Sequence, residues 1–372
     1  MILLSILLIF CESYSGTYSG GNGSASDPYK ISNISDLEEL MDTQGDWGSY
    51  FILTQNIDCS AHSWQNDNPQ PIGSSSTQFT GNFDGQGNII SNINFNISSI
   101  LGYVGFFGNI GSSASVSYLS LVDVNTTGES KVGSFCGSNE GTIYYCHTDG
   151  DADANFTVGG FCGSNLGTIS NCSAAGDADA TNNSAGGFCG SNFWWGNISN
   201  CSASGNATGN VHIGGFCGFS LGTISNCSAS GNATASNENA GGFCGSNSRV
   251  IEYCFSYGAT TSPSNSGGFV GFSDDDPYFN PSYTCCFWNE SVNLGLNDAG
   301  NISDLPNVEP LSAEEFTNPS NFSCFEFGSI WLMSDTMPIL AAFVIPTLTE
   351  WAVILFIGLL AGVGGWFVWR RM

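Results

Sequence analysis

Five pairs of cysteines recur along the middle of the chain, and paired thiols can ligate a metal, form disulfides or pack as small buried side chains. The cysteines of a pair stand ten residues apart in four copies and twelve in the fifth. The pairs are Cys136 and Cys146, Cys162 and Cys172, Cys189 and Cys201, Cys217 and Cys227, and Cys244 and Cys254. This spacing does not match a zinc site, and the chain has only three His residues. Two alternatives remain open: a disulfide within each repeat, which an exported protein can form, or cysteines stacked on their equivalents in neighbouring repeats.

Aspartates occupy the same place in two successive repeats. Asp151 and Asp153 alternate with alanine, and Asp177 and Asp179 repeat the pattern 26 residues later. On a strand, period-two alternation places the alanines inward and the four carboxylates outward. Carboxylates stacked on adjacent strands repel one another, and Ca²⁺ prefers such oxygen ligands. The pattern therefore suggests either a Ca²⁺ site or an acidic surface that solvent ions screen.

An aromatic segment, Phe193, Trp194 and Trp195, is an insertion within one repeat. Because the extra residues fall in a turn, we expect them to protrude and to contact a ligand such as a glycan or a protein. The alternative is an aromatic cap that folds back on its own coil.

No catalytic motif is evident in the sequence. It contains no His-Glu-x-x-His, no Gly-x-Ser-x-Gly and no P-loop. The run Asp274, Asp275 and Asp276 has only Arg249 near it in the sequence, and we interpret it as a solvated loop. We therefore predict no catalytic residue, and no cofactor apart from the Ca²⁺ considered above. The alternative is an extracellular polysaccharide lyase or hydrolase, which would need clustered carboxylates on one face.

The cysteine pairs belong to a repeating unit that predicts the fold. The Phe-Cys-Gly cysteines are separated by 26, 27, 28 and 27 residues. Each unit has short β-prone runs divided by Gly, Asn and Ser, and is too small to bury a core alone, so neighbours must stack. We predict an all-β, right-handed parallel β-helix with one coil of about 26–28 residues per repeat. Interior ladders are expected from the repeat Phe residues and from Ile143, Ile169, Ile198 and Ile224. A capping-box pattern from Ser35 to Glu38 predicts a short helix over the first coil.

The consensus Gly-Gly-Phe-Cys-Gly-Ser-Asn-x-Gly-Thr-Ile-Ser-Asn-Cys-Ser resembles the GLUG repeat. Residues 79–93 resemble the first coil of such proteins, and residues 20–41 resemble their N-terminal cap. The run Cys286-Phe-Trp-Asn and the stretch from Leu311 to Leu340 resemble their closing segment. The resemblance implies an N-terminal cap with the first strands at 16–78, β-helix repeats at 79–273 and a closing segment at 274–340.

The two ends and the charge indicate an exported, membrane-held protein. Residues 1–15 resemble a signal peptide that lacks its positively charged leader. The segment from Trp351 to Trp369 is uncharged and long enough to cross a bilayer, and Arg370 and Arg371 follow it, which predicts a cytoplasmic C-terminus. The formal net charge of −27 repels phosphate backbones, so nucleic-acid binding is excluded.

A short motif precedes the predicted membrane helix. Its residues are Ile345, Pro346, Thr347, Leu348, Thr349, Glu350 and Trp351. Motif, apolar helix and basic end at 345–372 resemble the bacterial IPTL-CTERM sorting tail, although Ala352 stands where that family usually has Gly. The resemblance implies recognition by an exosortase-type membrane enzyme. We therefore predict a structural or adhesive β-helix displayed at the cell surface, with a membrane-anchored ectodomain outside the cell.

Overall fold

The computed structural model describes residues 16–64, 69–97, 102–274, 276 and 278–341. The predicted signal peptide and the predicted membrane helix with its sorting motif lie outside the described residues. Within the ranges that are described, none of the helices is both long and apolar enough to cross a membrane.

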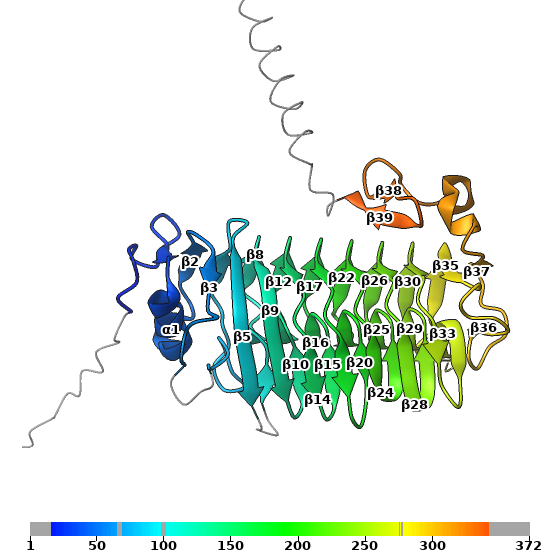
Figure 1. The fold of residues 1–372 in the computed structure, drawn as a ribbon, viewed down its shortest axis with the longest axis horizontal. Coiled ribbons are helices and arrows are strands. Elements are labelled where there is room, and N and C mark those ends of the chain that lie inside the picture. The colour runs from blue at the N-terminus through cyan, green and yellow to red at the C-terminus, as the bar shows by residue number, and fades with distance from the viewer. Residues whose placement is uncertain (1–15, 65–68, 98–101, 275, 277, 342–372) are drawn as a thin grey trace, which may run out of the picture.

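The described chain is a parallel β-solenoid of about eight turns (Figure 1). This confirms the predicted all-β repeat architecture. One wall is a ten-stranded parallel sheet built from strands of successive coils. Its strands are, in spatial order, β1 (Tyr29–Ile31), β2 (Tyr50–Leu53), β4 (Asn82–Asp84), β8 (Ser115–Ser117), β12 (Thr142–Tyr144), β17 (Thr168–Ser170), β22 (Asn197–Ser199), β26 (Thr223–Ser225), β30 (Val250–Glu252) and β34 (Ser282–Thr284).

A second, 27-stranded sheet forms the rest of the coils. The strands that contain or replace the first repeat cysteine are β7 (Phe107–Ile110), β11 (Cys136–Asn139), β16 (Cys162–Asn165), β21 (Cys189–Asn192), β25 (Cys217–Ser220), β29 (Cys244–Asn247) and β33 (Ser266–Ser273). The strands before them are β6 (Tyr103–Val104), β10 (Lys131–Gly133), β15 (Thr157–Gly159), β20 (Ala185–Gly186), β24 (Ala207–Gly214) and β28 (Ala233–Gly241). The remaining strands are β3 (Ile57–Asp58), β5 (Ile89–Ile97), β9 (Ser120–Gly128), β13 (His147–Thr148), β14 (Ala152–Ala154), β18 (Ser173–Ala174), β19 (Ala178–Ala180), β23 (Ser202–Ala203), β27 (Ser228–Ala229), β31 (Phe255–Ser256), β32 (Thr260–Thr261), β35 (Cys286–Asn289), β36 (Asn297–Ala299) and β37 (Val308–Leu311).

The turn before each second repeat cysteine needs a left-handed residue. Asn171, Asn200 and Asn226 occupy it with φ between 51° and 54°, and Tyr145 occupies it one coil earlier with φ 54°. Asparagine tolerates this region better than most residues, which explains the recurring Asn-Cys step. Glycine is needed where the strands of successive coils approach closely. A Cβ on Gly163, for example, would lie 2.7 Å from the backbone nitrogen of Val132.

The interior is built from stacked identical side chains, as predicted. The rings of Phe135, Phe161, Phe188, Phe216, Phe243 and Phe269 form one column, with neighbouring centroids 4.5–5.0 Å apart and planes within 10° of parallel. Ile143, Ile169, Ile198 and Ile224 align in register and are fully buried. Each column buries apolar surface only because the next coil covers it, so the coils are mutually dependent.

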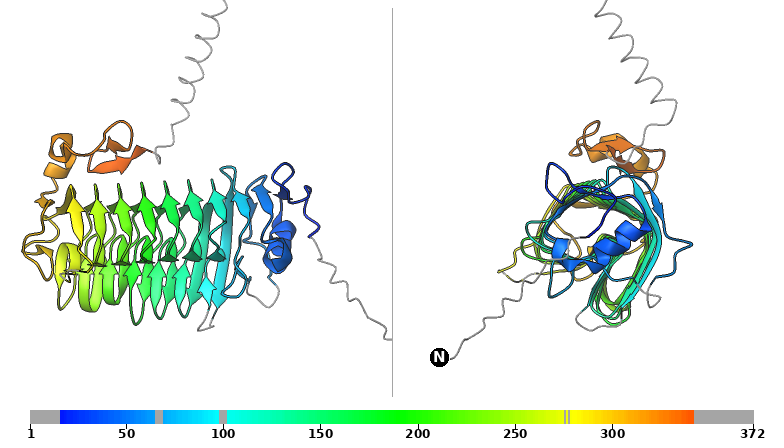
Figure 2. Two further views of the ribbon diagram at one scale, coloured as in Figure 1. Left: turned by 180° about the vertical axis from the view of Figure 1, so that it is seen from behind. Right: turned by 90° about the vertical axis from the view of Figure 1, so that its left-hand side faces the viewer.

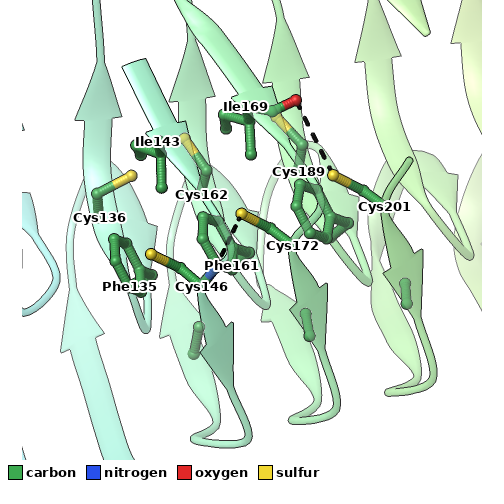
Figure 3. Packing of buried hydrophobic residues seen from close by; sticks show 14 of the residues in the cluster. Phe135, Cys136, Ile143, Cys146, Phe161, Cys162, Ile169, Cys172, Cys189 and Cys201 are labelled. Atoms are coloured by element: carbon green, nitrogen blue, oxygen red, sulfur yellow. Dashed lines mark hydrogen bonds between the residues drawn. The ribbon is translucent and has the colours of Figure 1, made fainter. Parts of the chain in front are cut away.

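The repeat cysteines form two buried ladders of free thiols (Figure 3). Cys136 pairs in register with Cys162, and the series continues through Cys189 and Cys217 to Cys244. In the second ladder, the backbone N–H of Cys146 contacts the sulfur of Cys172 at 3.4 Å. This arrangement favours the stacked alternative over a disulfide within each repeat. Each cysteine packs against its equivalent in the next coil instead of bonding to its sequence partner.

The N-terminal end is covered by the helix α1 (Ile34–Asp42), which lies across the opening of the first coil (Figure 2, right). Its buried residues include Leu37, Leu40 and Met41. The predicted helix is present, but its N-cap is Asn33, whose side chain accepts from the backbone N–H of Asp36 at 3.1 Å. The predicted cap at Ser35 is wrong because the helix already begins at Ile34.

At the other end, residues 312–341 fold back along the outside of the solenoid (Figures 1 and 2). We call this segment the closing strap. It contains η3 (Glu315–Thr317), η4 (Pro319–Phe322) and the antiparallel strands β38 (Trp331–Met333) and β39 (Pro338–Leu340). A second apolar core joins it to the coils through Phe255 and Phe287, and a disulfide links Cys285 to Cys324. Phe255 stands at the register position of Ser228, so the coil under the strap has exchanged a polar residue for an aromatic one.

Candidate functional site

The clearest candidate site is a groove of about 450 Å³ on the later coils. It is lined by Trp194, His212, Phe219, Leu221, Glu238, Asn239, Ser246, Ser248, Asn265, Phe272, Asp274 and Phe279. This volume lies in the range of small-molecule sites. We call these residues the aromatic groove, because four of them carry benzene or indole rings.

Two groove aromatics replace a serine of the repeat consensus. Phe219 pairs in register with Ser191 on one side and Ser246 on the other, and Ser246 pairs with Phe272. In the serine-bearing coils this position is buried, whereas Phe219 and Phe272 are half-buried and line the groove. Replacing serine by phenylalanine therefore adds aromatic surface at one position of two coils and leaves the strand pairing unchanged.

A polar ladder also lines the groove. Asn265 donates to the side-chain oxygen of Asn239 at 2.8 Å, and the side-chain nitrogen of Asn239 lies 3.2 Å from Nδ1 of His212. All three residues have left-handed backbones, with φ of 54°, 62° and 55°. This conformation is uncommon for residues other than glycine and is enriched at functional positions. We call these three residues the polar ladder.

Burial lowers the pKa of His212, and the nearby carboxylate of Glu238 opposes that shift. The lowered pKa keeps the imidazole neutral at neutral pH. An amide nitrogen can only donate, so Nδ1 of the neutral ring accepts from Asn239 and the ring proton resides on Nε2. His212 thus offers a donor at the ring atom opposite the ladder.

Trp194 and Phe279 come from two different turns. Their rings stack with centroids 5.7 Å apart, and the guanidinium of Arg249 lies 5.8 Å from the centre of the Trp194 ring. Trp194 is 48 % exposed and Trp195 is 85 % exposed, while Phe193 is half-buried. The insertion therefore protrudes, as predicted, but only Trp194 of the three lines the groove. Their predicted role as ligand contacts stays a prediction.

The groove contains two carboxylates with different surroundings. Asp274 accepts from the hydroxyl of Ser248 at 3.1 Å and from the backbone N–H of Asp276 at 3.0 Å. Asp276 in turn accepts from the backbone N–H of Tyr278. The predicted acidic loop is thus organised by its own backbone. Glu238 lies on β28, at the register position of Val211 in the preceding coil.

The four predicted Ca²⁺ ligands do not converge. Asp153 and Asp179 pair in register and are exposed, with buried alanines on either side, as the alternation predicted. The carboxylate of Asp151, however, accepts from the backbone N–H of Asp177 at 2.8 Å, and that of Asp177 accepts from the N–H of Asn206 at 2.7 Å. These two side chains tie one coil to the next. In the described part of the chain, no three His, Cys, Asp or Glu side chains are grouped to hold a metal ion.

A shallower hollow of about 440 Å³ adjoins that acidic row. Its lining includes Glu129, Asp153 and Asp179. Glu129 accepts from the side chain of Asn155 at 2.6 Å. Neighbouring protein atoms displace part of the water around the exposed Asp153 carboxylate, which raises its pKa, and the carboxylates of Asp179 and Asp151 raise it further. Such mutual repulsion is what unneutralised neighbouring carboxylates produce.

Two features of the structure were missed by sequence reasoning. The disulfide partners Cys285 and Cys324 lie outside the repeat pattern, and the adjacent pair Cys285-Cys286 was the available signal that one of them has a separate role. Phe219 and Phe272 were visible as departures from the serine of the consensus. A position-by-position alignment of the repeats would have shown Phe219 and Phe272 as substitutions of the consensus serine.

Comparison with known proteins agrees with the repeat architecture. The family described as the GLUG motif matches residues 154–179, 181–208 and 209–234. The chain therefore contains GLUG repeats, as the consensus predicted. The match covers part of the solenoid, which extends beyond it in both directions.

Two relatives share about a third of the chain. Halomucin from Haloquadratum walsbyi is 32% identical over 128 residues, which are 33% of this chain and 1% of that protein. A "Putative Gly-rich membrane protein" from Evansella cellulosilytica is 31% identical over 141 residues, 36% of this chain and 16% of that protein. The chain thus spans only a small part of the length of either relative.

One solved structure has a similar fold. It is the crystal structure of "a putative immunoglobulin A1 protease from Bacteroides ovatus", with a TM-score of 0.54 and 18% sequence identity. The match covers 87% of this chain and 95% of that one. At this identity the likeness shows the fold alone.

Proposed function

We propose that this protein is a cell-surface β-solenoid that binds an extracellular ligand through the aromatic groove. The observation that carries the proposal is the groove itself. Its aromatic side chains are partly exposed on a scaffold whose own core needs none of them. Exposed aromatic side chains beside convergent polar groups are typical of binding sites.

Surface location is supported by features outside the solenoid. The uncharged segment from Trp351 to Trp369, followed by Arg370 and Arg371, has the length and flanks of a membrane anchor. One relative is named as a membrane protein. In this proposal the ectodomain is outside the cell, the C-terminus is cytoplasmic, and an exosortase-type enzyme recognises the motif that begins at Ile345.

Cell fractionation tests the anchor. The full chain should sediment with membranes and be cut by protease added to intact cells. A chain that stops after Ala341 keeps β39 and should be released into the medium or periplasm. Leu360→Arg is the matched full-length variant, because a charge near the bilayer centre opposes insertion by about 3 kcal/mol. Membrane retention of the truncated chain would contradict the anchor.

The sorting motif has a separate test. In a host that has an exosortase-type enzyme, the native chain should be cut near the motif and lose the mass of its tail, whereas Pro346→Ala should keep the tail. In a host that lacks the enzyme, both chains should keep the tail. Identical masses of the native chain in the two hosts would remove the sorting enzyme from the proposal and leave the anchor.

We propose binding over catalysis because of the groove carboxylates. Glycoside hydrolysis generally needs two carboxylates facing one bond. The Asp274 carboxylate already accepts hydrogen bonds from Ser248 and from the backbone N–H of Asp276. Of the described groove residues, Glu238 is therefore the one carboxylate left to act on a substrate, and one does not make the required pair. Incubation with polysaccharides should therefore release no new reducing ends. Release that Glu238→Gln abolishes would favour the alternative, an extracellular carbohydrate-active enzyme.

A further inference from the structure

We propose that the aromatic groove binds a neutral glycan chain, with sugar rings lying on its aromatic side chains and sugar hydroxyls bonded to the polar ladder. This inference deepens the binding role proposed above and rests on it. It assigns a ligand class to a site that the repeat pattern does not require.

The first argument is the chemistry of the walls. A pyranose ring has apolar C–H faces and a rim of hydroxyls, so it needs a flat apolar surface beside hydrogen-bonding groups. Phe219 and Phe272 supply such surfaces two coils apart, and Trp194 and Phe279 add a stacked pair at the edge. Aromatic rings present large apolar area with little conformational freedom to lose on binding.

The second argument is the polar ladder, which lines the same groove as these rings. A sugar hydroxyl both donates and accepts, and a side-chain amide can satisfy both roles. Asn239 and Asn265 each use one amide N–H within the ladder, and His212 offers its Nε2–H. Successive ladder residues lie on neighbouring coils, which are roughly 4.8 Å apart in a parallel sheet. That spacing is comparable to the advance of one sugar along an extended chain.

Charge argues against anionic ligands. The protein carries a net charge of −27, and the groove itself contributes Glu238 and Asp274. Arg249 is the cation beside the groove, and its guanidinium lies against the Trp194 ring. Uronate chains, sulfated glycans and nucleic acids would meet unfavourable potential here. A neutral glycan is free of that repulsion.

Strand pairing argues against an extended peptide. A peptide that binds by β-augmentation needs an unpaired strand edge. β24 is paired with β20 and β28, and β25 is paired with β21 and β29. On β33, the backbone N–H and C=O of Ser273, next to Phe272, are bonded to the side chain of Asn301. The backbone groups of these strands are engaged along the solenoid, so recognition in the groove must come from side chains.

Calorimetric titration of the purified full chain tests the proposal, in a detergent whose headgroup is not a sugar. The probes are cellohexaose, chitohexaose, xylohexaose and maltohexaose, with oligogalacturonate as the anionic comparison. We expect at least one neutral probe to bind and oligogalacturonate not to bind. The double variant Phe219→Ser with Phe272→Ser restores the repeat consensus and should raise Kd by roughly ten- to a hundredfold.

Tyr145→Ala is the matched control. Tyr145 is also exposed and stacks on Tyr118, but it lies at a different corner of an earlier coil and should leave Kd unchanged. Asn239→Ala, which interrupts the polar ladder, should also weaken binding. Absence of binding by all four neutral probes, tighter binding of oligogalacturonate, or equal Kd for the double variant and the native chain would overturn the proposal. Because purified protein is used, these outcomes are independent of the fractionation that tests surface location.

Discussion

The side-chain nitrogen of Asn165 donates to the side-chain oxygen of Asn192 across 2.9 Å, inside the solenoid and away from all solvent. Asn139 donates to Asn165 in the same way at 2.8 Å. Asn165 also accepts from the backbone N–H of Gly167, two residues ahead in its own turn. Each buried amide therefore closes a turn in its own coil and bonds to the coil that follows.

Replacing Asn165 by Ala should lower the free energy of unfolding by about 2–4 kcal/mol. The substitution leaves the buried amides of Asn139 and Asn192 without their partner, and unsatisfied buried polar groups are costly. Asn165→Ser should cost less, since Ser220 holds the equivalent position of a later coil. Asn237→Ala, an exposed asparagine, is the control and should change stability by less than about 0.5 kcal/mol. Equal chemical denaturation curves for Asn165→Ala and the native chain would contradict this.

Thiol labelling should separate the two kinds of cysteine. Burial raises the pKa of Cys146, Cys172, Cys201 and Cys227 well above the usual thiol value, so these thiols stay protonated and unreactive in the folded protein. Unfolding without reductant should expose all ten repeat cysteines to alkylation, as measured by peptide mass. Cys285 and Cys324 should react only after reduction. Protection of any repeat cysteine in the unfolded, unreduced chain would restore the disulfide alternative.

Asp153→Asn should stabilise the protein slightly at neutral pH. The pKa of Asp153 is raised in the folded state, so the folded state binds this proton more readily than the unfolded state does. Stability therefore falls as pH rises from the ordinary carboxyl value of 3.8 through the raised value. The asparagine of the Asp153→Asn variant does not ionise, so the variant does not lose stability in this way as the pH rises. Because the side chain is exposed, solvent screening limits the gain to a few tenths of a kcal/mol.

Melting temperatures across pH and salt provide the measurement for Asp153. The advantage of the variant should vanish below the ordinary carboxyl pKa and should shrink in high NaCl. Asp335→Asn, in the exposed turn before β39, is the comparison variant. Ca²⁺ at matched ionic strength should do no more than NaCl. A rise in melting temperature specific to Ca²⁺ and lost in Asp153→Asn would revive the calcium site.

The coils could be predicted because the same physical requirement recurs in each. Every turn needs one Phe, one Ile and one left-handed residue, so five near-copies reveal the period and the interior columns. Whether Cys136 and Cys146 bond to each other or stack on their equivalents could not be predicted, because a spacing of ten residues does not determine how the chain bends between them. Stacking in a solenoid pairs each residue with its equivalent one coil away, which favours Cys136 beside Cys162.

The groove was only partly visible in the sequence. Trp194 was marked by its insertion, and Phe219 and Phe272 by their departure from serine. Phe279 had no such mark, because it reaches Trp194 from a loop 85 residues further along the chain. The position of the closing strap could not be predicted either, because it depends on contacts between segments far apart in the sequence. The ring centroids of Phe287 and Phe322, for example, are 4.8 Å apart.

Phe255 should hold the closing strap without being needed by the coil beneath it. Its ring lies 5.6 Å from Trp331 and 5.7 Å from Phe316, both in the strap. Phe255→Ser recreates the residue that the preceding coil carries at this register, Ser228. Deletion of a buried Phe side chain costs about 3–5 kcal/mol, and here the loss should fall on strap docking.

Hydrogen exchange measured by mass spectrometry tests where that loss falls. In Phe255→Ser, residues 312–341 should exchange faster while β25 and β29 keep their protection. Phe243→Ser removes a ring of the same size from the interior column and should lower protection across the neighbouring coils. Reduction of the Cys285–Cys324 disulfide, which closes a 39-residue separation worth about 4 kcal/mol in the chain-entropy model, should loosen the strap further in Phe255→Ser. If Phe255→Ser instead deprotects the coils as widely as Phe243→Ser does, the strap is part of the main core and not a docked closure.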